Sequence, residues 1–143
     1  MEKSHDLKFN NNQYEKCLNK VLSYYSEKDT NLIVVIIGPS GSGKTLLAKR
    51  ALIDGLLISP DELIASEEFI RSLSNKDIII DDVFLFDIRN VLKYVHRSLA
   101  SGRKVILTGR PEDESLYQQL LFNLPKKISP LFIKLAGENS LYL

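Results

Sequence analysis

One stretch of eight residues, 38–45, reads Gly-Pro-Ser-Gly-Ser-Gly-Lys-Thr and combines three glycines with a cation and a hydroxyl. Glycines allow the backbone to curl until several N–H groups point inward, an arrangement that suits phosphate oxygens. We expect Lys44 to reach the outer phosphates of a nucleotide as a point charge and the Thr45 hydroxyl to hold Mg²⁺. The residues expected to surround the phosphates are Gly38, Pro39, Ser40, Gly41, Ser42, Gly43, Lys44, Thr45 and Leu46.

The segments on either side favour a phosphate-binding P-loop over a chance glycine turn. Residues 32–37 are all apolar and rich in β-branched types, which predicts a buried strand. Residues 46–52 are rich in helix formers, and a helix that begins near Lys44 directs its positive dipole end at the phosphates. A strand, a glycine loop and a helix in this order are the context that a P-loop requires. The predicted ligands are therefore ATP or ADP with Mg²⁺.

Two adjacent carboxylates, Asp81 and Asp82, follow the apolar run 78–80. In an open α/β sheet, ligands bind at the carboxyl ends of the strands, where the P-loop also lies. We therefore assign Asp81 to the metal and Asp82 to the water that attacks the γ-phosphate. The plainer interpretation is a carboxylate pair that ends a strand and starts a turn.

Three further positions carry groups suited to phosphate chemistry, but less specifically. Thr108 ends another predicted strand, so its hydroxyl either senses the γ-phosphate, as a third catalytic group beside Lys44 and Asp82, or is an ordinary strand residue. Arg110 is more typical of a surface charge than of a phosphate ligand. Lys126 and Lys127 are more typical of a solvated loop than of a contact to a nucleotide on a neighbouring subunit.

The elements that position these residues alternate between strands and helices, which predicts an α/β fold with three α/β/α layers and a five-stranded parallel sheet. A dense helix-start signal, Ser-Pro-Asp-Glu, occupies 59–62. An additional short edge strand is expected within 136–143. The predicted strands are 32–37, 56–58, 77–82, 104–108 and 131–135, and the predicted helices are 14–25, 44–55, 59–75, 87–102 and 111–121.

The chain is expected to consist of an extended N-terminal arm, 1–12, and a single domain, 13–143. The arm is expected to end in an Asn turn at 10–12. Apolar residues then recur at helical spacing, which predicts an amphipathic helix with one core face. Cys17 falls on this face and is interpreted as a small buried hydrophobe. The face is formed by Tyr14, Cys17, Leu18, Val21, Leu22 and Tyr25.

The charge, the cysteine content and the apolar runs of the sequence argue against several classes of protein. The chain has 143 residues and a formal net charge of +1, so no overall basic field argues for nucleic-acid binding. The single cysteine excludes an internal disulfide and fits a reducing compartment. Because no signal-peptide pattern and no run long enough to span a membrane occur in the sequence, the expected location is the cytoplasm.

Three segments resemble the AAA+ ATPase domain of the bacterial replication initiator family DnaA, and more closely its short regulatory homologues of the Hda type. They are 38–48, 78–83 and 91–111. The resemblance implies an AAA+ core, ATP or ADP with Mg²⁺, and regulation of replication initiation through contacts with a DnaA-type initiator ATPase. It also implies a possible homo-oligomer, and a possible contact with the DNA-polymerase sliding clamp through 5–9, a degenerate version of the family's clamp-binding peptide.

The chain departs from the resembled family in ways that predict slow or absent hydrolysis. Lys126 and Lys127 stand where the family usually places an arginine finger, and Lys lacks the planar fork of Arg. Neither the family's helical lid nor a DNA-binding domain is recognisable in the sequence. Two other functions stay open: a small P-loop kinase that phosphorylates a metabolite, and a binding module that has the AAA+ shape but uses no nucleotide.

Overall fold

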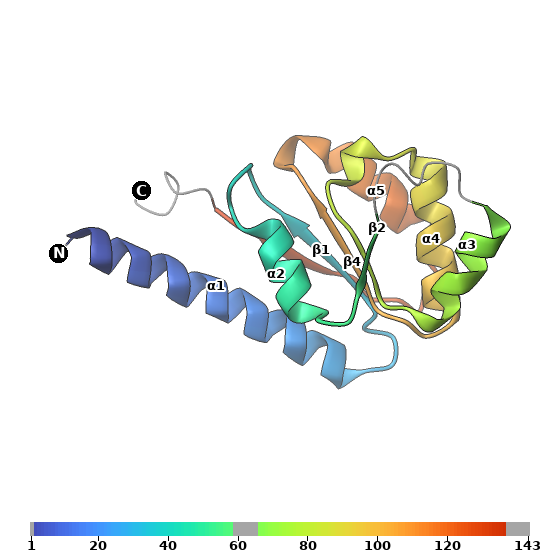
Figure 1. Cartoon of the computed structure of the whole chain (residues 1–143), viewed down its shortest axis with the longest axis horizontal. Helices are drawn as coiled ribbons and strands as arrows, with labels where there is room; N and C mark the ends of the chain where they lie inside the picture. Colours follow the sequence, from blue (N-terminus) through green and yellow to red (C-terminus); the bar gives the residue numbers. More distant parts are fainter. Residues whose placement is uncertain (1, 59–65, 137–143) are drawn as a thin grey trace.

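Five parallel strands form one sheet in the order β2-β3-β4-β1-β5. The two longest strands, β1 (Ile33–Ile37) and β4 (Val105–Gly109), are neighbours and pair Ile36 with Thr108. The remaining strands are β2 (Leu56–Ile58), β3 (Ile78–Ile80) and β5 (Leu131–Lys134). Since all five strands run parallel, their carboxyl ends share one edge of the sheet (Figure 1). The P-loop follows β1 at this edge, Asp81 and Asp82 follow β3, and Thr108 lies near the end of β4.

The computed structural model describes residues 2–58 and 66–136, with residues 2–12 described by their backbone alone. Three single turns of 3₁₀-helix, Leu73–Asn75, Val83–Leu85 and Pro111–Asp113, follow or precede the longer elements. In these described ranges no helix is both long and apolar enough to cross a membrane. The α-helices are α1 (Glu2–Glu27), α2 (Lys44–Ala51), α3 (Glu67–Ser72), α4 (Ile88–Ala100) and α5 (Glu114–Phe122).

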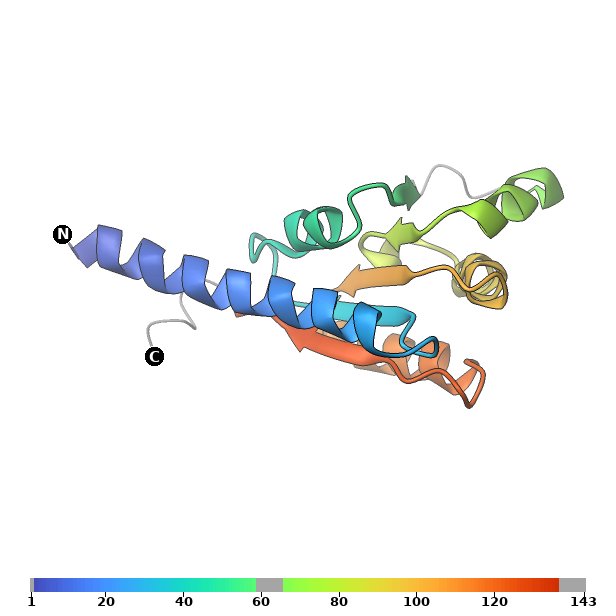
Figure 2. The ribbon, with the colours of Figure 1, turned by 90° about the horizontal axis from the view of Figure 1, so that it is seen from below.

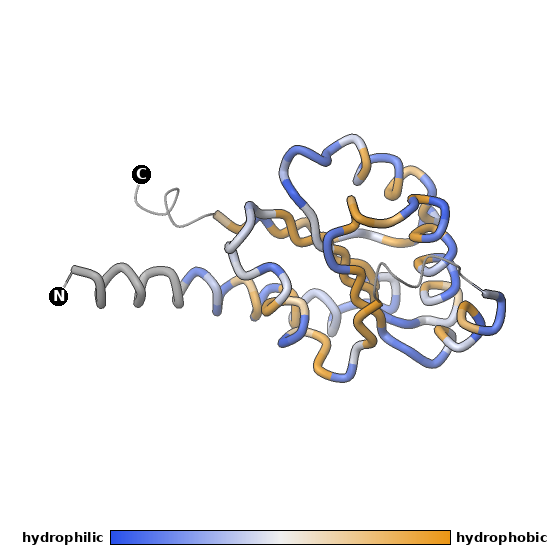
Figure 3. Tube along the Cα trace, turned by 45° about the horizontal axis from the view of Figure 1, so that its top comes forward, coloured by the Kyte–Doolittle hydropathy of each residue, from blue (hydrophilic) through white to orange (hydrophobic). Residues whose placement is uncertain are grey.

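Alternate residues of the central strands point into two separate hydrophobic clusters, as the period of two in a strand requires. In β1, Val34 and Ile36 pack with α1 and α2, whereas Ile33 and Val35 pack with the helices α4 and α5. The sheet is therefore covered on both faces, which explains why its strands are continuously apolar. Hydrophobic segments gather along the strands, whereas polar ones occupy the outer turns (Figure 3). The predicted three-layer α/β/α fold is confirmed.

Helix α1 corrects the prediction of an extended arm with an Asn turn. It begins at Glu2 and runs unbroken through residues 10–12, and its first turns project beyond the sheet (Figures 1 and 2). Its second half docks as predicted, because Leu18 and Val21 are buried and the Tyr25 hydroxyl donates to the Val105 carbonyl at 2.7 Å. Three members of the predicted face differ: Leu22 is exposed, and Tyr14 and Cys17 are half-buried.

The predicted ends of α4 are confirmed, whereas the region of the predicted helix 59–75 differs in part. Asp87 caps α4 by accepting from the Arg89 N–H, and Gly102 follows that helix in a left-handed conformation (φ 71°). In the region of the predicted helix 59–75, α3 begins only after Ser66, whose hydroxyl accepts from the Phe69 N–H, and the last turn ends at Asn75. The predicted start at 59–62 and most of the expected edge strand within 136–143 lie outside the described residues.

Candidate nucleotide-binding site

The loop between β1 and α2 has the conformation that its glycines permit. Gly41 and Gly43 have φ angles of 79° and 92°, in the left-handed region where a side chain is disfavoured. Gly38 is needed for space, because a Cβ there would lie 2.5 Å from Ser42 Oγ and 3.0 Å from the Leu135 carbonyl oxygen. Gly43 directly precedes the first residue of α2, so the helix N-terminus faces the loop. This geometry is a cradle for an anion.

Lys44 lies within this cradle and not in solvent. Its side chain is buried, and Nζ donates to the Gly38 carbonyl at 2.7 Å and to the Pro39 carbonyl at 3.2 Å. The loop thus holds the ammonium beside its own backbone, where a phosphate would meet it. Ser42 Oγ is buried with no hydrogen-bond partner within the described part of the chain. A buried hydroxyl without a partner is costly, and a phosphate oxygen is a suitable acceptor for it.

Thr45 and Asp81 meet although 36 residues separate them in the chain. Thr45 Oγ1 donates to the Asp81 carboxylate, at 2.8 Å from Oδ1 and 2.9 Å from Oδ2. A hydroxyl and a carboxylate side by side next to a phosphate cradle are oxygen ligands that Mg²⁺ accepts, with water and phosphate completing the shell. In the described part of the chain, no group of three or more His, Cys, Asp or Glu side chains could hold a metal ion. These two residues fit the predicted role of holding the metal.

Thr108 is positioned by its strand to organise the carboxylates. Its buried hydroxyl donates to Asp81 Oδ1 at 2.6 Å and accepts from the Asp82 N–H at 2.9 Å. One hydroxyl therefore fixes both the side chain of the first aspartate and the backbone of the second. The Thr108 O–H is directed at Asp81 and not into the space for a phosphate. Sensing of the γ-phosphate by Thr108 therefore stays a prediction.

Asp82 adopts a left-handed backbone conformation with φ 54° and ψ 66°, which is uncommon for a residue other than glycine. Burial raises the pKa of its carboxyl, the Asp81 charge raises it further, and Lys44 and Arg110 oppose both effects. A carboxylate with a raised pKa is better suited to accept a proton from water than one in free solution. The geometry is therefore compatible with the predicted role of Asp82 toward the attacking water.

A cavity of about 500 Å³ joins the P-loop to the strand ends. Its lining adds two residues to the predicted set, Phe84 and Arg110. The Arg110 guanidinium lies 3.7 Å from the centre of the Phe84 ring. Arg110 could be suspected from the sequence because it directly follows β4, whereas no pattern in the sequence indicated Phe84. The lining consists of Ser40, Gly41, Ser42, Gly43, Lys44, Thr45, Leu46, Asp82, Phe84 and Arg110.

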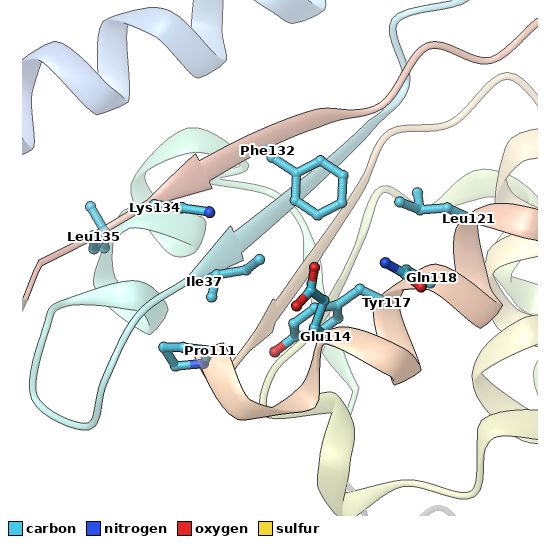
Figure 4. A pocket seen from close by; sticks show the side chains of 9 residues that line it. All are labelled: Ile37, Pro111, Glu114, Tyr117, Gln118, Leu121, Phe132, Lys134 and Leu135. Atoms are coloured by element: carbon cyan, nitrogen blue, oxygen red, sulfur yellow. The ribbon is translucent and has the colours of Figure 1, made fainter.

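A second cavity, of about 600 Å³, lies between α5 and the edge strand β5 (Figure 4). Tyr117, Leu121 and Phe132 give it mostly apolar walls, whereas Glu114 and Lys134 supply one charge of each sign. None of the P-loop residues lines it, so this cavity is separate from the phosphate site despite its larger volume.

The other cations of the described chain lie away from the P-loop cavity. Lys126 and Lys127 are exposed in the loop before β5, as predicted for a solvated loop. Arg50 pairs with Glu15, Arg89 with Asp87, and Arg103 with Asp77. Among the arginines in the described ranges, Arg110 is the one that lines the nucleotide cavity.

Comparison with known proteins supports the fold. Neither a protein-family model nor a curated protein matches the sequence. Among solved structures, the crystal structure of the DnaC helicase loader superposes with a TM-score of 0.59 at 14% identity, over 84% of this chain and 89% of that one. The chain therefore shares the α/β fold of that structure, with a five-stranded parallel sheet covered by helices. The identity is low enough that this likeness extends to the fold alone.

Proposed function

We propose that this protein binds ATP or ADP together with Mg²⁺ and that the bound nucleotide controls its contacts with other proteins. The observation that carries the proposal is the contact between Thr45 and Asp81, at 2.8 Å, directly beside the glycine cradle that holds Lys44. A cradle, a cation and a pair of metal-binding oxygens are the parts that a nucleoside triphosphate with Mg²⁺ requires. When bound, Mg²⁺ would neutralise phosphate charge, and Thr45 and Asp81 are the residues that would hold it.

The same geometry supports slow or absent hydrolysis. Asp82 offers a base for water, but efficient P-loop NTPases also stabilise the transition-state charge with an arginine, which is worth about a thousandfold or more in rate. Lys126 and Lys127 lack the fork of an arginine if they approach the nucleotide of a second copy in a homo-oligomer.

For the biological role, we propose regulation of chromosomal replication initiation through a DnaA-type initiator ATPase. Its support is the resemblance of segments 38–48, 78–83 and 91–111, together with a fold shared with a helicase loader. That structural neighbour also favours a second candidate partner, a replicative helicase. Contact with the sliding clamp through 5–9 is a further proposal, and this segment lies within helix α1.

A thermal-shift measurement with millimolar Mg-ATP and Mg-ADP tests nucleotide binding. Ligand that binds the native state alone raises the melting temperature, by an amount that reflects about 2.7 kcal/mol at one hundred times Kd. Lys44→Ala should abolish the shift, whereas Lys49→Ala, an exposed lysine on the same helix, should retain it. Absence of any shift in the wild-type protein would instead favour a binding module that uses no nucleotide.

Pull-down experiments test the partners. The full chain is immobilised and presented separately with purified DnaA, sliding clamp and replicative helicase, each with ATP, with ADP and without nucleotide. Retention of DnaA that depends on nucleotide and is lost in Lys44→Ala supports the proposal. Retention of the helicase alone would contradict the proposed contact with DnaA and would indicate that the helicase is the partner.

Metabolite phosphorylation remains the competing activity, and one observation weighs against it. Kinases of this size usually bring several arginines to the transferred phosphate, whereas the described chain directs only Arg110 to the cavity. Stoichiometric phosphoryl transfer to a small molecule in a substrate screen would nevertheless overturn the regulatory role.

A further inference from the structure

Arg110 occupies an unusual position for a surface cation. It is the first residue after β4, and its side chain, 39% exposed, lines the cavity formed by the P-loop and Asp82. The guanidinium packs on the face of the Phe84 ring at 3.7 Å from the ring centre. Stacking of this kind keeps a guanidinium planar and oriented while its edge stays available for hydrogen bonds.

The backbone and the side chain of Arg110 are held to different degrees. Its carbonyl accepts from the buried Tyr117 hydroxyl at 2.5 Å, which fixes the backbone against α5. The guanidinium is held by Asp113, with Nε and Nη2 donating to the two carboxylate oxygens at 2.9 and 3.0 Å. A partly exposed ion pair of this kind contributes little net stability, so its replacement by another anion costs little.

The guanidinium is also not saturated by Asp113. It has five N–H donors, and the bonds to Asp113 use Nε and Nη2, which leaves the Nη1 donors without a partner among the described side chains. A terminal phosphate carries more charge than a carboxylate and offers three acceptor oxygens. Arg binds phosphate through the same planar fork that it now presents to Asp113.

We propose that Arg110 is a phosphate-binding residue that distinguishes ATP from ADP at this site. The inference rests on the proposed binding of nucleotide. With ATP, the guanidinium turns on its Phe84 platform from Asp113 to an oxygen of the γ-phosphate. With ADP, it stays on Asp113. Because Asp113 and Tyr117 belong to the segment that leads into and forms α5, this exchange reports the state of the nucleotide to that helix.

The test compares Kd for Mg-ATP and Mg-ADP by titration calorimetry on the full chain. Arg110→Ala should weaken ATP about tenfold or more and leave ADP within about twofold, since a charge-assisted hydrogen bond is lost with ATP alone. Asp113→Asn, which frees the guanidinium, should strengthen ATP binding and leave ADP unchanged. Arg103→Ala is the matched control, because Arg103 is 40% exposed and also paired with an aspartate, and it should change neither value.

The outcomes separate this inference from the proposed function. Wild-type protein that binds neither nucleotide overturns both. If the wild type binds nucleotide and Arg110→Ala weakens ATP and ADP equally, or neither, only the role of Arg110 is overturned. Asp113→Asn also keeps the test valid if Arg110→Ala fails to fold, because a loss of ATP affinity in Asp113→Asn contradicts the exchange.

Discussion

Thr45 Oγ1 lies 2.8 Å from Asp81 Oδ1, and this contact joins the two halves of the candidate site. One residue belongs to the first turn of α2 and the other follows β3, which is not adjacent to β1 in the sheet. Between them lies β4, which supplies Thr108 to the same carboxylate at 2.6 Å. The metal-binding oxygens therefore depend on the strand order as much as on the motif that contains Thr45.

Replacing Thr108 with valine removes this link while preserving side-chain shape. The Asp82 N–H then loses its acceptor and Asp81 loses a donor, so the free energy of unfolding should fall by about 1–3 kcal/mol. Urea denaturation measures the loss, and the thermal shift with Mg-ATP should also decrease. Thr108→Ser keeps the hydroxyl and should retain that thermal shift. Equal shifts in the two variants would show that the hydroxyl does not organise the site.

Asp82→Asn should separate binding from turnover. The amide has nearly the same shape and tolerates a positive φ, but it accepts no proton from water. We expect the slow ATP turnover to fall about a hundredfold or to background, with the Kd for Mg-ATP within about twofold of the wild type. Phosphate release is the measurement, with exposed Asp29→Asn as the control. A full wild-type rate would exclude Asp82 from the reaction.

Gly109→Ala tests the close approach between β4 and α5. A Cβ at this position would lie 2.0 Å from the Tyr117 hydroxyl oxygen, which itself bonds the Arg110 carbonyl. Crowding of this kind should lower the free energy of unfolding by about 1–3 kcal/mol and displace Tyr117. Gly102→Ala is the comparison, because it has open space but a φ of 71°, and it should cost only about 1 kcal/mol. If Gly109→Ala is as stable as the wild type, α5 is not anchored through this contact.

The ion pair of Arg110 predicts a dependence on pH. Hydrogen bonds from Arg110 hold the pKa of the Asp113 carboxyl below its usual value, so folding favours the ionised form. The resulting stability is present above about pH 4, the region of an unperturbed aspartate, and is lost as pH falls through the lowered pKa. The wild type should be slightly more stable than Asp113→Asn, by a difference in unfolding free energy that is constant near neutrality and shrinks in acid. A difference that stays constant down to pH 2 would contradict the lowered pKa.

Much of the fold was predictable because each element carries its own local signal. Continuous apolar runs predicted β1 and β3, the spacing of apolar residues predicted α4, and Asp87 and Gly102 marked its ends. The local signal misled at the N-terminus, where residues 10–12 suggested a turn but lie within α1. Asn is a poor helix former by a few tenths of a kcal/mol only, and a long helix overrides so small a preference.

The candidate site divides in a similar way between sequence and structure. The sequence alone determined the cradle 38–45 and the acidic strand end at Asp81 and Asp82, because a P-loop is contiguous and its chemistry follows from residue types at fixed spacing. Only the tertiary structure decided that Thr108 bonds Asp81 and that Arg110 enters the cavity on Phe84. These partners come from separate strands and turns, and their distances depend on the strand order and on how α5 packs. No periodicity in the chain encodes that information.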